Sequence, residues 1–460
     1  MFGKVKKIHF VGAGGIGMSG IAEILITMGF TVSGSDLTKS DITDRLEKIG
    51  AKIYLSHSTD NVINVDVVVV SSAIRSDNVE VIEAKKRKIP VIKRAEMLSE
   101  LIRMKYGIAI AGSHGKTTTT SIVSSILLED GLDPTVVVGG KVQELGGNAR
   151  LGEGKYIIAE ADESDGSFLM LIPYLTVITN IDKEHLDFYQ NYKNILTAFA
   201  GFANRVPFYG ANYICGDDKG VREIIPFIKK RFYTYGFSQE NDIVIKNIRR
   251  KGVKTFYDLD FMGERIENIG TNLWGKHNIL NSAAAISIAK EINVKNSSII
   301  NALDKFSGVA RRMEVKYSSE DYLILDDYGH HPVEINATIT ALKEQYPEKR
   351  LVVAFQPHRY SRTRDLMDEF ATSFNCDLLI ITDIYAASET PIEGVSGEKL
   401  FWKIKDNLGD KVHFAGSLGE VEEFVKKILE PGDIFLTLGA GNIVKVSDEI
   451  SKNLKESNEK

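Results

Sequence analysis

The chain has little cysteine, no long apolar run and no excess of basic residues. Its two cysteines, Cys215 and Cys376, lie far apart and outside any Cys/His cluster, so neither a disulfide framework nor a zinc site is indicated. No run of about 18 apolar residues is present, so no membrane span is expected. Gly12 and Gly14 interrupt the first apolar stretch, which does not fit a signal peptide. The formal net charge of -5 disfavours bulk binding to nucleic acid. We therefore expect a cytoplasmic protein that binds neither membrane nor nucleic acid.

The composition that remains is that of a folded globular protein, with 43% hydrophobic and 26% charged residues. At about 150 residues per domain, the length predicts roughly three domains. Short β-rich runs alternate with helical stretches in three blocks, which favours an α/β fold with mostly parallel sheets. We predict a Rossmann-like domain over residues 1–104, a central domain over 105–310 and a C-terminal Rossmann-like domain over 311–460. Residues 235–270 resemble a peripheral hairpin region, and the polar tail after Ser451 is expected to fray.

The first motif that carries chemistry is GAGGIG at residues 12–17, between a predicted strand and a predicted helix. Asp36 follows about 20 residues later, as in dinucleotide-binding fingerprints. The glycines let the backbone approach a diphosphate, and the helix N-terminus supplies amide donors. These requirements specify a diphosphate rather than a nicotinamide, so a UDP-sugar competes with NAD or NADP. Taken alone, the motif favours NAD(P), and the glycines could also serve only a tight turn.

The second motif is GSHGKTTTT at residues 112–120. A lysine after glycine brings an ammonium group to the β- and γ-phosphates of a nucleotide, and a following hydroxyl can ligate Mg²⁺. A full Walker A pattern would have glycine where Ile110 stands. Strand, glycine loop, lysine and threonine-rich helix nevertheless occur together, so we interpret the segment as a phosphate-binding loop. Residues 105–310 are therefore expected to form a central P-loop-type ATPase domain.

Glu160 and His185 are candidate metal ligands, because both follow predicted strands at the edge where open α/β sheets bind ligands. Mg²⁺ prefers oxygen ligands, so the residues alone favour a hydrogen-bonding role for His185. Asp162, Glu163 and Asp165 crowd the same stretch as Glu160. Which carboxylate contacts each metal stays open.

Ten segments in order resemble the Mur ligase family of peptidoglycan synthesis, over essentially the whole chain. They are GAGGIGMSG, GSHGKTTTT, AEADESDGSF, NIDKEHLDFY, GKHNILNSAAA, RRMEV, DDYGHHP, FQPHRYSRT, DIYAASETPIEGVS and LGAGNI.

The resemblance implies four groups of site residues. UDP-sugar binding is implied for Gly12, Gly14, Gly15, Ile16, Gly17, Ser35, Asp36, Ser71 and Arg94. ATP binding is implied for Gly112, Ser113, His114, Gly115, Lys116, Thr117, Thr118, Asn278, Asn281, Arg312 and Asp327. Mg²⁺ ligation is implied for Thr117, Glu160 and His185, and amino-acid binding for His330, Arg359 and Arg362.

The activity implied by the resemblance is the ATP-dependent joining of L-alanine to the carboxylate of UDP-N-acetylmuramic acid through an acyl phosphate. This reaction is the first amino-acid addition in peptidoglycan precursor synthesis, and the enzyme is expected as a monomer or weak homodimer. The residues expected to act in catalysis are Lys116, His185, Asn278, Asn281, Arg312 and Asp327. Three alternatives remain open: a ligase that recycles murein tripeptide on the same sugar nucleotide, an NAD(P)-dependent dehydrogenase, and a non-catalytic nucleotide switch.

Overall fold

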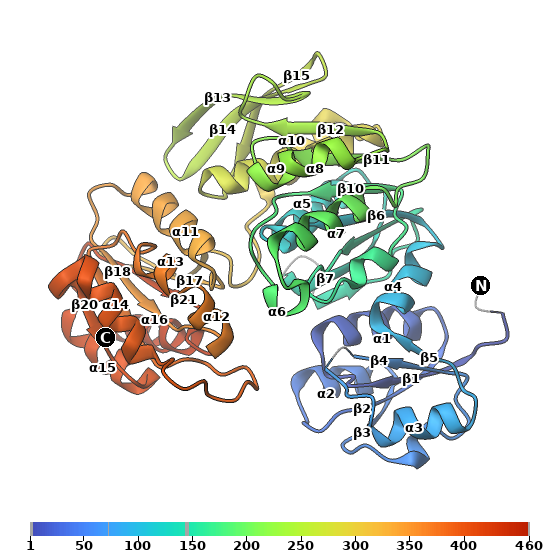
Figure 1. Ribbon diagram of the computed structural model, residues 1–460. Coiled ribbons are helices and arrows are strands. Elements are labelled where there is room, and N and C mark those ends of the chain that lie inside the picture. The colour runs from blue at the N-terminus through green and yellow to red at the C-terminus, as the bar shows by residue number, and fades with distance from the viewer. Residues whose placement is uncertain (1–2, 72, 143–146, 459–460) are drawn as a thin grey trace. The chain divides into compact units, whose positions relative to one another are not determined.

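A computed structural model describes residues 3–71, 73–142 and 147–458 (Figure 1). The first sheet is wholly parallel, in the order β3-β2-β1-β4-β5. Short aliphatic runs such as KIHFV and VVVV form its central strands, as expected for parallel strands buried on both faces. Its strands are β1 (Lys7–Val11), β2 (Thr31–Ser35), β3 (Lys52–Tyr54), β4 (Val67–Val70) and β5 (Val91–Lys93), and its helices are α1 (Ile16–Thr27), α2 (Asp41–Lys48), α3 (Val79–Lys86) and α4 (Arg94–Ile102).

The second sheet has ten strands in the order β15-β14-β13-β12-β11-β10-β6-β9-β7-β8. Its central strands are parallel, and the antiparallel pairs among the described residues lie toward its two ends. The strands are β6 (Tyr106–Ala111), β7 (Thr135–Val142), β8 (Gly147–Arg150), β9 (Tyr156–Glu160), β10 (Leu175–Ile178), β11 (Ala211–Cys215), β12 (Phe232–Gly236), β13 (Ile243–Lys251), β14 (Lys254–Phe261) and β15 (Glu264–Thr271). The helices are α5 (Lys116–Glu129), α6 (Leu186–Tyr189), α7 (Tyr192–Ala203), α8 (Lys219–Ile224), α9 (Lys276–Glu291) and α10 (Asn296–Lys305).

The third sheet has the order β16-β17-β21-β18-β19-β20, parallel except for the β16–β17 pair. Alternate residues of its strands enter two different cores: Leu323 and Leu325 pack on one face, and Ile324 packs on the other. This sheet is therefore covered by helices on both faces. The strands are β16 (Glu314–Ser318), β17 (Leu323–Asp327), β18 (Leu351–Phe355), β19 (Leu378–Ile381), β20 (Val412–Phe414) and β21 (Ile434–Leu438), and the helices are α11 (Pro332–Gln345), α12 (Tyr360–Asp365), α13 (Met367–Ala371), α14 (Gly397–Leu408), α15 (Leu418–Ile428) and α16 (Val444–Asn458).

Three mostly parallel sheets covered by helices confirm the predicted fold class. The hairpin region expected over residues 235–270 is also present, as the antiparallel strands β13, β14 and β15. The prediction of a fraying tail after Ser451 was wrong, because α16 continues through it to Asn458. Val446, Ile450 and Leu454 recur at helical spacing and pack against the third sheet, so the helix is held by its apolar stripe.

By contacts between residues, the chain divides into two units. Unit 1 comprises residues 1–272 and 278–306 and contains the first two sheets, and unit 2 comprises residues 273–277 and 307–460 and contains the third. Within the described part of the chain, no helix has both the length and the apolar character needed to cross a membrane.

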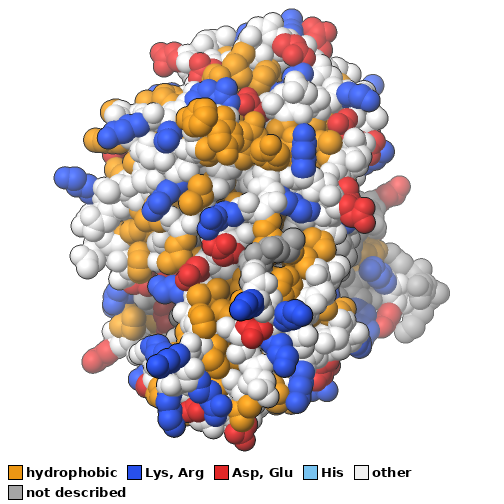
Figure 2. All heavy atoms as spheres, turned by 90° about the vertical axis from the view of Figure 1, so that its right-hand side faces the viewer, with side chains coloured by type: hydrophobic (Ala, Val, Ile, Leu, Met, Phe, Trp, Pro, Cys, Tyr) orange, Lys and Arg blue, Asp and Glu red, His pale blue; other side chains and the backbone are white. Residues whose placement is uncertain are grey.

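A row of aromatic rings crosses the amino ends of the parallel strands in the second sheet. Tyr106, at the start of β6, contacts Tyr174 just before β10, and Tyr174 stacks on Tyr209 just before β11, with ring centroids 5.2 and 5.9 Å apart. Phe208 extends the row and is largely exposed. Figure 2 shows one face of the molecule, on which hydrophobic side chains gather in groups separated by Lys and Arg. Because the strands are parallel, their carboxyl ends lie at the opposite edge, where ligands bind in such sheets.

Candidate functional site

The phosphate loop lies between β6 and α5 and takes a conformation that suits glycine. Gly112 and Gly115 have φ of +134° and +85°, and a Cβ on Gly112 would collide with Oγ1 of Thr179. The segment after β10 supports the loop through two hydrogen bonds. The amide of His114 donates to Oδ1 of Asn180 over 2.8 Å, and Oγ1 of Thr179 donates to the His114 carbonyl over 2.6 Å. The glycine backbone and these two hydrogen bonds therefore define the shape of the loop with protein groups alone.

Lys116, the first residue of α5, folds back over this loop. Its ammonium group donates to the carbonyls of Gly112 and Ser113 at 2.5 and 3.2 Å, and to Oε1 of Glu163 at 2.8 Å. Burial alone would lower the pKa of Lys116, but Glu163, Glu184 and Asp162 outweigh it and raise the pKa. The lysine is thus a fixed positive charge at the helix N-terminus, where an anion is also favoured by the helix dipole.

Glu163 is nearly fully buried beside this lysine. Its burial raises its pKa to about 7, although Lys116 opposes the rise. Thr117 and Thr118 follow in the first turn of α5, with Thr118 buried and Thr117 half-buried. Ser113 completes the contacts of the loop, because its hydroxyl accepts from the amide of Asp182 over 2.9 Å.

Three side chains near Lys116 lie close enough together to hold a metal ion. Glu163, Glu184 and His185 each offer one ligand atom, and these atoms all lie within 4.8 Å of one another. Nε2 of His185 is 3.8 Å from Glu163 and 3.9 Å from Glu184. Two carboxylates suit a hard cation such as Mg²⁺. Glu160, at the end of β9, is not a member of this group among the described residues, whereas His185 is.

His185 sits on an unusual backbone. It precedes the short helix α6 in the left-handed region, with φ of +55°. Non-glycine residues rarely adopt this conformation, which costs on the order of 1 kcal/mol. The strained backbone turns the imidazole toward Glu163 and Glu184.

Asn278 and Asn281 lie one turn apart in α9, and both are buried. Nδ2 of Asn281 donates to Oδ1 of Asn278 over 3.3 Å. A Cβ on Gly115 would stand 2.6 Å from Oδ1 of Asn281. This pair of amides therefore lies directly against the phosphate loop, as its implied role in nucleotide binding requires.

The N-terminal glycine loop is hydrogen-bonded to the end of β2. The amides of Gly12 and Ala13 donate to the carbonyl of Ser35 at 2.9 and 3.0 Å, and the amide of Gly14 donates to Oδ2 of Asp36 at 2.9 Å. Asp36 thereby shapes the loop. The hydroxyl of Ser35 is buried and donates to Oε2 of Glu80 over 2.6 Å.

Ser71 and Arg94 lie against the same loop. A Cβ on Gly12 would stand 3.1 Å from Cβ of Ser71, and one on Gly17 would stand 3.1 Å from Nη1 of Arg94. Nη2 of Arg94 also donates to Asp162 over 3.1 Å, which links the loop to the segment that contains Glu160 and Glu163. Gly15 and Ile16 form the start of α1.

In unit 2, Asp327 is the last residue of β17, and Arg312 lies just before β16, the strand that pairs with β17. The guanidinium of Arg312 lies over the ring of Tyr328 and 3.4 Å from Glu334. Asp327, at the end of β17, accepts from the amides of Met313 and Gly329 at 2.7 and 2.8 Å. Burial raises the pKa of Asp327 to about 6, against the lowering effect of Arg312.

His330, Arg359 and Arg362 gather where β17 and β18 end. The ring of His330 lies 5.7 Å from that of His358, and Nδ1 of His358 accepts from Nη1 of Arg362 over 3.3 Å. Arg359 has φ of +72°, and its amide donates to the carbonyl of Tyr385 over 2.9 Å. Burial, together with His330 and the two arginines, lowers the pKa of His358 to about 3. The structure thus brings the three predicted residues to one sheet edge.

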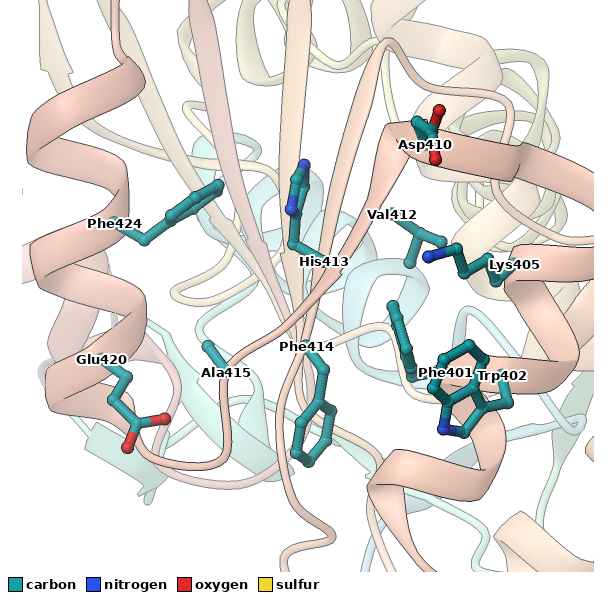
Figure 3. Close-up of a pocket in the computed structure, with 10 residues that line it drawn as sticks. All are labelled: Phe401, Trp402, Lys405, Asp410, Val412, His413, Phe414, Ala415, Glu420 and Phe424. Carbon is teal, nitrogen blue, oxygen red and sulfur yellow. The ribbon is translucent and has the colours of Figure 1, made fainter.

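Unit 2 also contains an open pocket of about 740 Å³ beside the edge strand β20. Figure 3 shows Phe401, Trp402 and Phe414 on one side of the strand and Phe424 on the other. The ammonium of Lys405 lies over the Phe401 and Trp402 rings. None of the predicted site residues lines this pocket.

Several residues of these sites were not singled out from the sequence. Glu184 adjoins the predicted His185, and His358 lies in the segment FQPHRYSRT beside Arg359, so adjacency to a predicted residue was an available signal. Glu163 was named only as one of a crowded set of carboxylates. Its contact with Lys116 joins positions 47 residues apart, which no local pattern reveals.

Comparison with known proteins identifies the class to which these sites belong. The chain matches the descriptions "Mur ligase family, catalytic domain" over residues 7–106, "Mur ligase middle domain" over 110–289 and "Mur ligase, glutamate ligase domain" over 311–441. The chain belongs to the Mur ligase family and has its three-domain architecture.

Individual relatives extend over the whole chain. A UDP-N-acetylmuramate–L-alanine ligase of Geobacter sulfurreducens is 52% identical over 459 residues, which are 99% of each chain. The crystal structure of a UDP-N-acetylmuramate-alanine ligase from Thermotoga maritima is 28% identical and covers 98% of this chain and 99% of its own, with a TM-score of 0.82. A murein peptide ligase from Psychrobacter arcticus, at 22% identity and a TM-score of 0.69 over 96% and 99% of the two chains, shares the fold.

Proposed function

We propose that this protein is an ATP-dependent ligase that joins L-alanine to the carboxylate of UDP-N-acetylmuramic acid. The observation that carries the proposal is the 52% identity, over 99% of both chains, with a ligase named for this reaction. The sites described above support it, because a phosphate loop with Lys116, a diphosphate-type glycine loop and an arginine cluster supply one site for each substrate. We place the protein in the cytoplasm.

The proposed chemistry has two steps. A carboxylate oxygen of the sugar attacks the γ-phosphorus of ATP, ADP leaves, and an acyl phosphate forms. The amine of alanine, after losing a proton, attacks the acyl carbon, and phosphate leaves as the amide bond forms. Lys116 contributes by holding positive charge where the phosphoryl group develops negative charge.

Mg²⁺ fits the carboxylates and imidazole of Glu163, Glu184 and His185, and it would offset phosphate charge when bound. Thr117 and Glu160 remain proposed ligands as well. Arg312, Asn278, Asn281 and Asp327 are proposed to contact the nucleotide, and the nine residues around the N-terminal glycine loop are proposed to hold the UDP-sugar. His330, Arg359 and Arg362 are proposed to bind alanine, whose carboxylate suits the planar fork of arginine.

Phosphate release from ATP in the presence of UDP-N-acetylmuramic acid tests this function directly. We expect release to require both the sugar nucleotide and L-alanine. Release with murein tripeptide but not with alanine would instead identify the recycling ligase. Tight calorimetric binding of NAD or NADP that UDP-N-acetylmuramic acid fails to displace would favour the dehydrogenase.

A further inference from the structure

A buried carboxylate lies beneath the N-terminal glycine loop and belongs to none of the groups assigned above. Glu80, in the first turn of α3, is fully buried. Its Oε2 accepts from the Ser35 hydroxyl at 2.6 Å and lies 2.7 Å from Nδ1 of His57. Its Oε1 accepts from Nδ2 of Asn61 at 2.6 Å and lies 3.4 Å from Nε2 of His9. One carboxylate thus joins β1, β2, the segment after β3 and α3.

The donors around Glu80 keep it ionised. Burial alone would raise the pKa of Glu80, but the nearby His9 ring and hydrogen bonds from Ser35, Asn61 and His57 outweigh it and lower the pKa to about 2. An ionised carboxylate accepts hydrogen bonds and cannot donate them. In a neutral His57 ring, the proton must therefore be on Nδ1.

The hydrogen bonds of Glu80 adjoin the glycine loop through Ser35. Ser35, whose hydroxyl Glu80 holds, is the residue whose carbonyl accepts from Gly12 and Ala13. His57 follows β3, the neighbour of β2 in the sheet, and its Nδ1 is 3.2 Å from the Ser35 hydroxyl. The His57 side chain is 16% exposed, whereas those of His9 and Glu80 are fully buried. Among the described residues, none forms a hydrogen bond with Nε2 of His57.

We propose that Glu80 is a positioning residue of the sugar-nucleotide site, which anchors Ser35 beneath the glycine loop and fixes His57 in the tautomer that presents an unprotonated Nε2. Nε2 accepts from a donor of the uridine diphosphate group, such as uracil N3–H or a ribose hydroxyl. Glu80 itself touches no substrate. The inference rests on the proposed function, because it requires that the glycine loop binds a uridine nucleotide.

Glu80→Gln tests the proposal with little change of shape. The new amide keeps one acceptor oxygen, which faces Asn61, because Nδ2 of Asn61 also donates to the Ser56 carbonyl and stays a donor. Its NH2 group then faces Ser35 and His57, and the His57 ring can accept from it only by moving its proton to Nε2. We expect the KM for UDP-N-acetylmuramic acid to rise about tenfold or more, with kcat and the KM values for ATP and alanine within twofold of wild type. Glu23→Gln is the matched control, since Glu23 is a buried, ion-paired glutamate of the same sheet's helix α1, and it should change none of these constants.

A second variant and a spectroscopic readout separate positioning from general damage to the fold. His57→Ala keeps Glu80 with its Ser35 and Asn61 contacts, and it should raise the same KM. Adding Glu80→Gln to it should then raise the KM less than Glu80→Gln does in the wild type, because part of its effect acts through His57. Ring ¹⁵N spectra of histidine-labelled protein, assigned by the signal lost in His57→Ala, should show Nδ1–H in the wild type and Nε2–H in Glu80→Gln.

Calorimetry with UDP and with UDP-N-acetylmuramic acid distinguishes the failure of this inference from that of the proposed function. If the wild type binds neither, the proposed function fails. If the wild type binds them and Glu80→Gln binds equally well, only the role of Glu80 is refuted. A wild-type His57 ring that carries its proton on Nε2, or on both nitrogens, would overturn the tautomer assignment.

Discussion

Replacing Lys116 with methionine should slow ligation strongly while leaving the chain folded. An ammonium group and an oxygen anion 2.8 Å apart, the distance from Lys116 to Glu163, attract by about 6 kcal/mol at an effective dielectric constant of 20. A phosphoryl oxygen at the same distance from the ammonium group gains a similar attraction. If about half of it appears only in the transition state, its loss raises the activation free energy by about 3 kcal/mol, and kcat falls roughly a hundredfold or more.

The effect of this substitution on stability depends on Glu163. Without the lysine, the pKa of this buried carboxyl should rise further above its value of about 7, because Lys116 lowers it. Glu163 then becomes neutral at pH 7 instead of remaining an unpaired buried charge, which would be the costly outcome. Glu163→Gln in the Lys116→Met background should therefore change the melting temperature little.

The assay is phosphate release at saturating substrates, with circular dichroism to verify folding. Lys193→Met is the control, since Lys193 is an exposed lysine of the neighbouring helix α7, and it should retain wild-type kcat. A folded Lys116→Met enzyme with near-normal turnover would refute the role of this lysine in phosphoryl transfer.

Three other perturbations test different parts of the molecule. Arg359→Ala or Arg362→Ala should each raise the alanine KM by about 30-fold, the equivalent of one charge-assisted hydrogen bond of about 2 kcal/mol, and an unchanged KM in both singles and the double mutant would move the amine site elsewhere. Gly112→Ala should lower the melting temperature and abolish ATP turnover, because of its collision with Thr179, whereas Gly252→Ala, also at positive φ but in open space, should keep its activity. Asp327 binds its proton more tightly in the folded state, with a pKa of about 6 against an ordinary value of 3.8, so the free energy of unfolding should fall by about 2 kcal/mol as the pH rises from 4 to 6; thermal melts over this range should show a smaller slope for Asp327→Asn, and an identical slope would contradict this expectation.

The features that the sequence predicts are those formed by contiguous residues. The phosphate loop, the N-terminal glycine loop and the strand–helix alternation each occupy one short segment, so local rules suffice to recognise them. The apolar stripe of α16 was also present in the sequence, but the polar composition of the tail concealed it. In this tail the spacing of the apolar residues, and not the polar composition, determines the structure.

The features that the sequence does not predict depend on which segments the topology brings together. Glu80 lies 45 residues from Ser35 and 23 from His57, and a glutamate in the first turn of a helix is ordinarily solvated there. Only the strand order β3-β2-β1-β4 places it beneath the glycine loop. Lys116 and Glu163 meet for the same reason, across the neighbouring strands β6 and β9.

His185 and Arg359 both have positive φ values. At these two positions a substitution can therefore raise thermal stability while it removes activity. Glycine adopts such φ values at no steric cost, so His185→Gly and Arg359→Gly would each relax the local chain even as they delete the imidazole and the guanidinium. A screen for heat resistance alone would therefore tend to select variants that have lost the proposed metal and amino-acid contacts. Selection for thermostability in this protein needs a simultaneous demand for turnover.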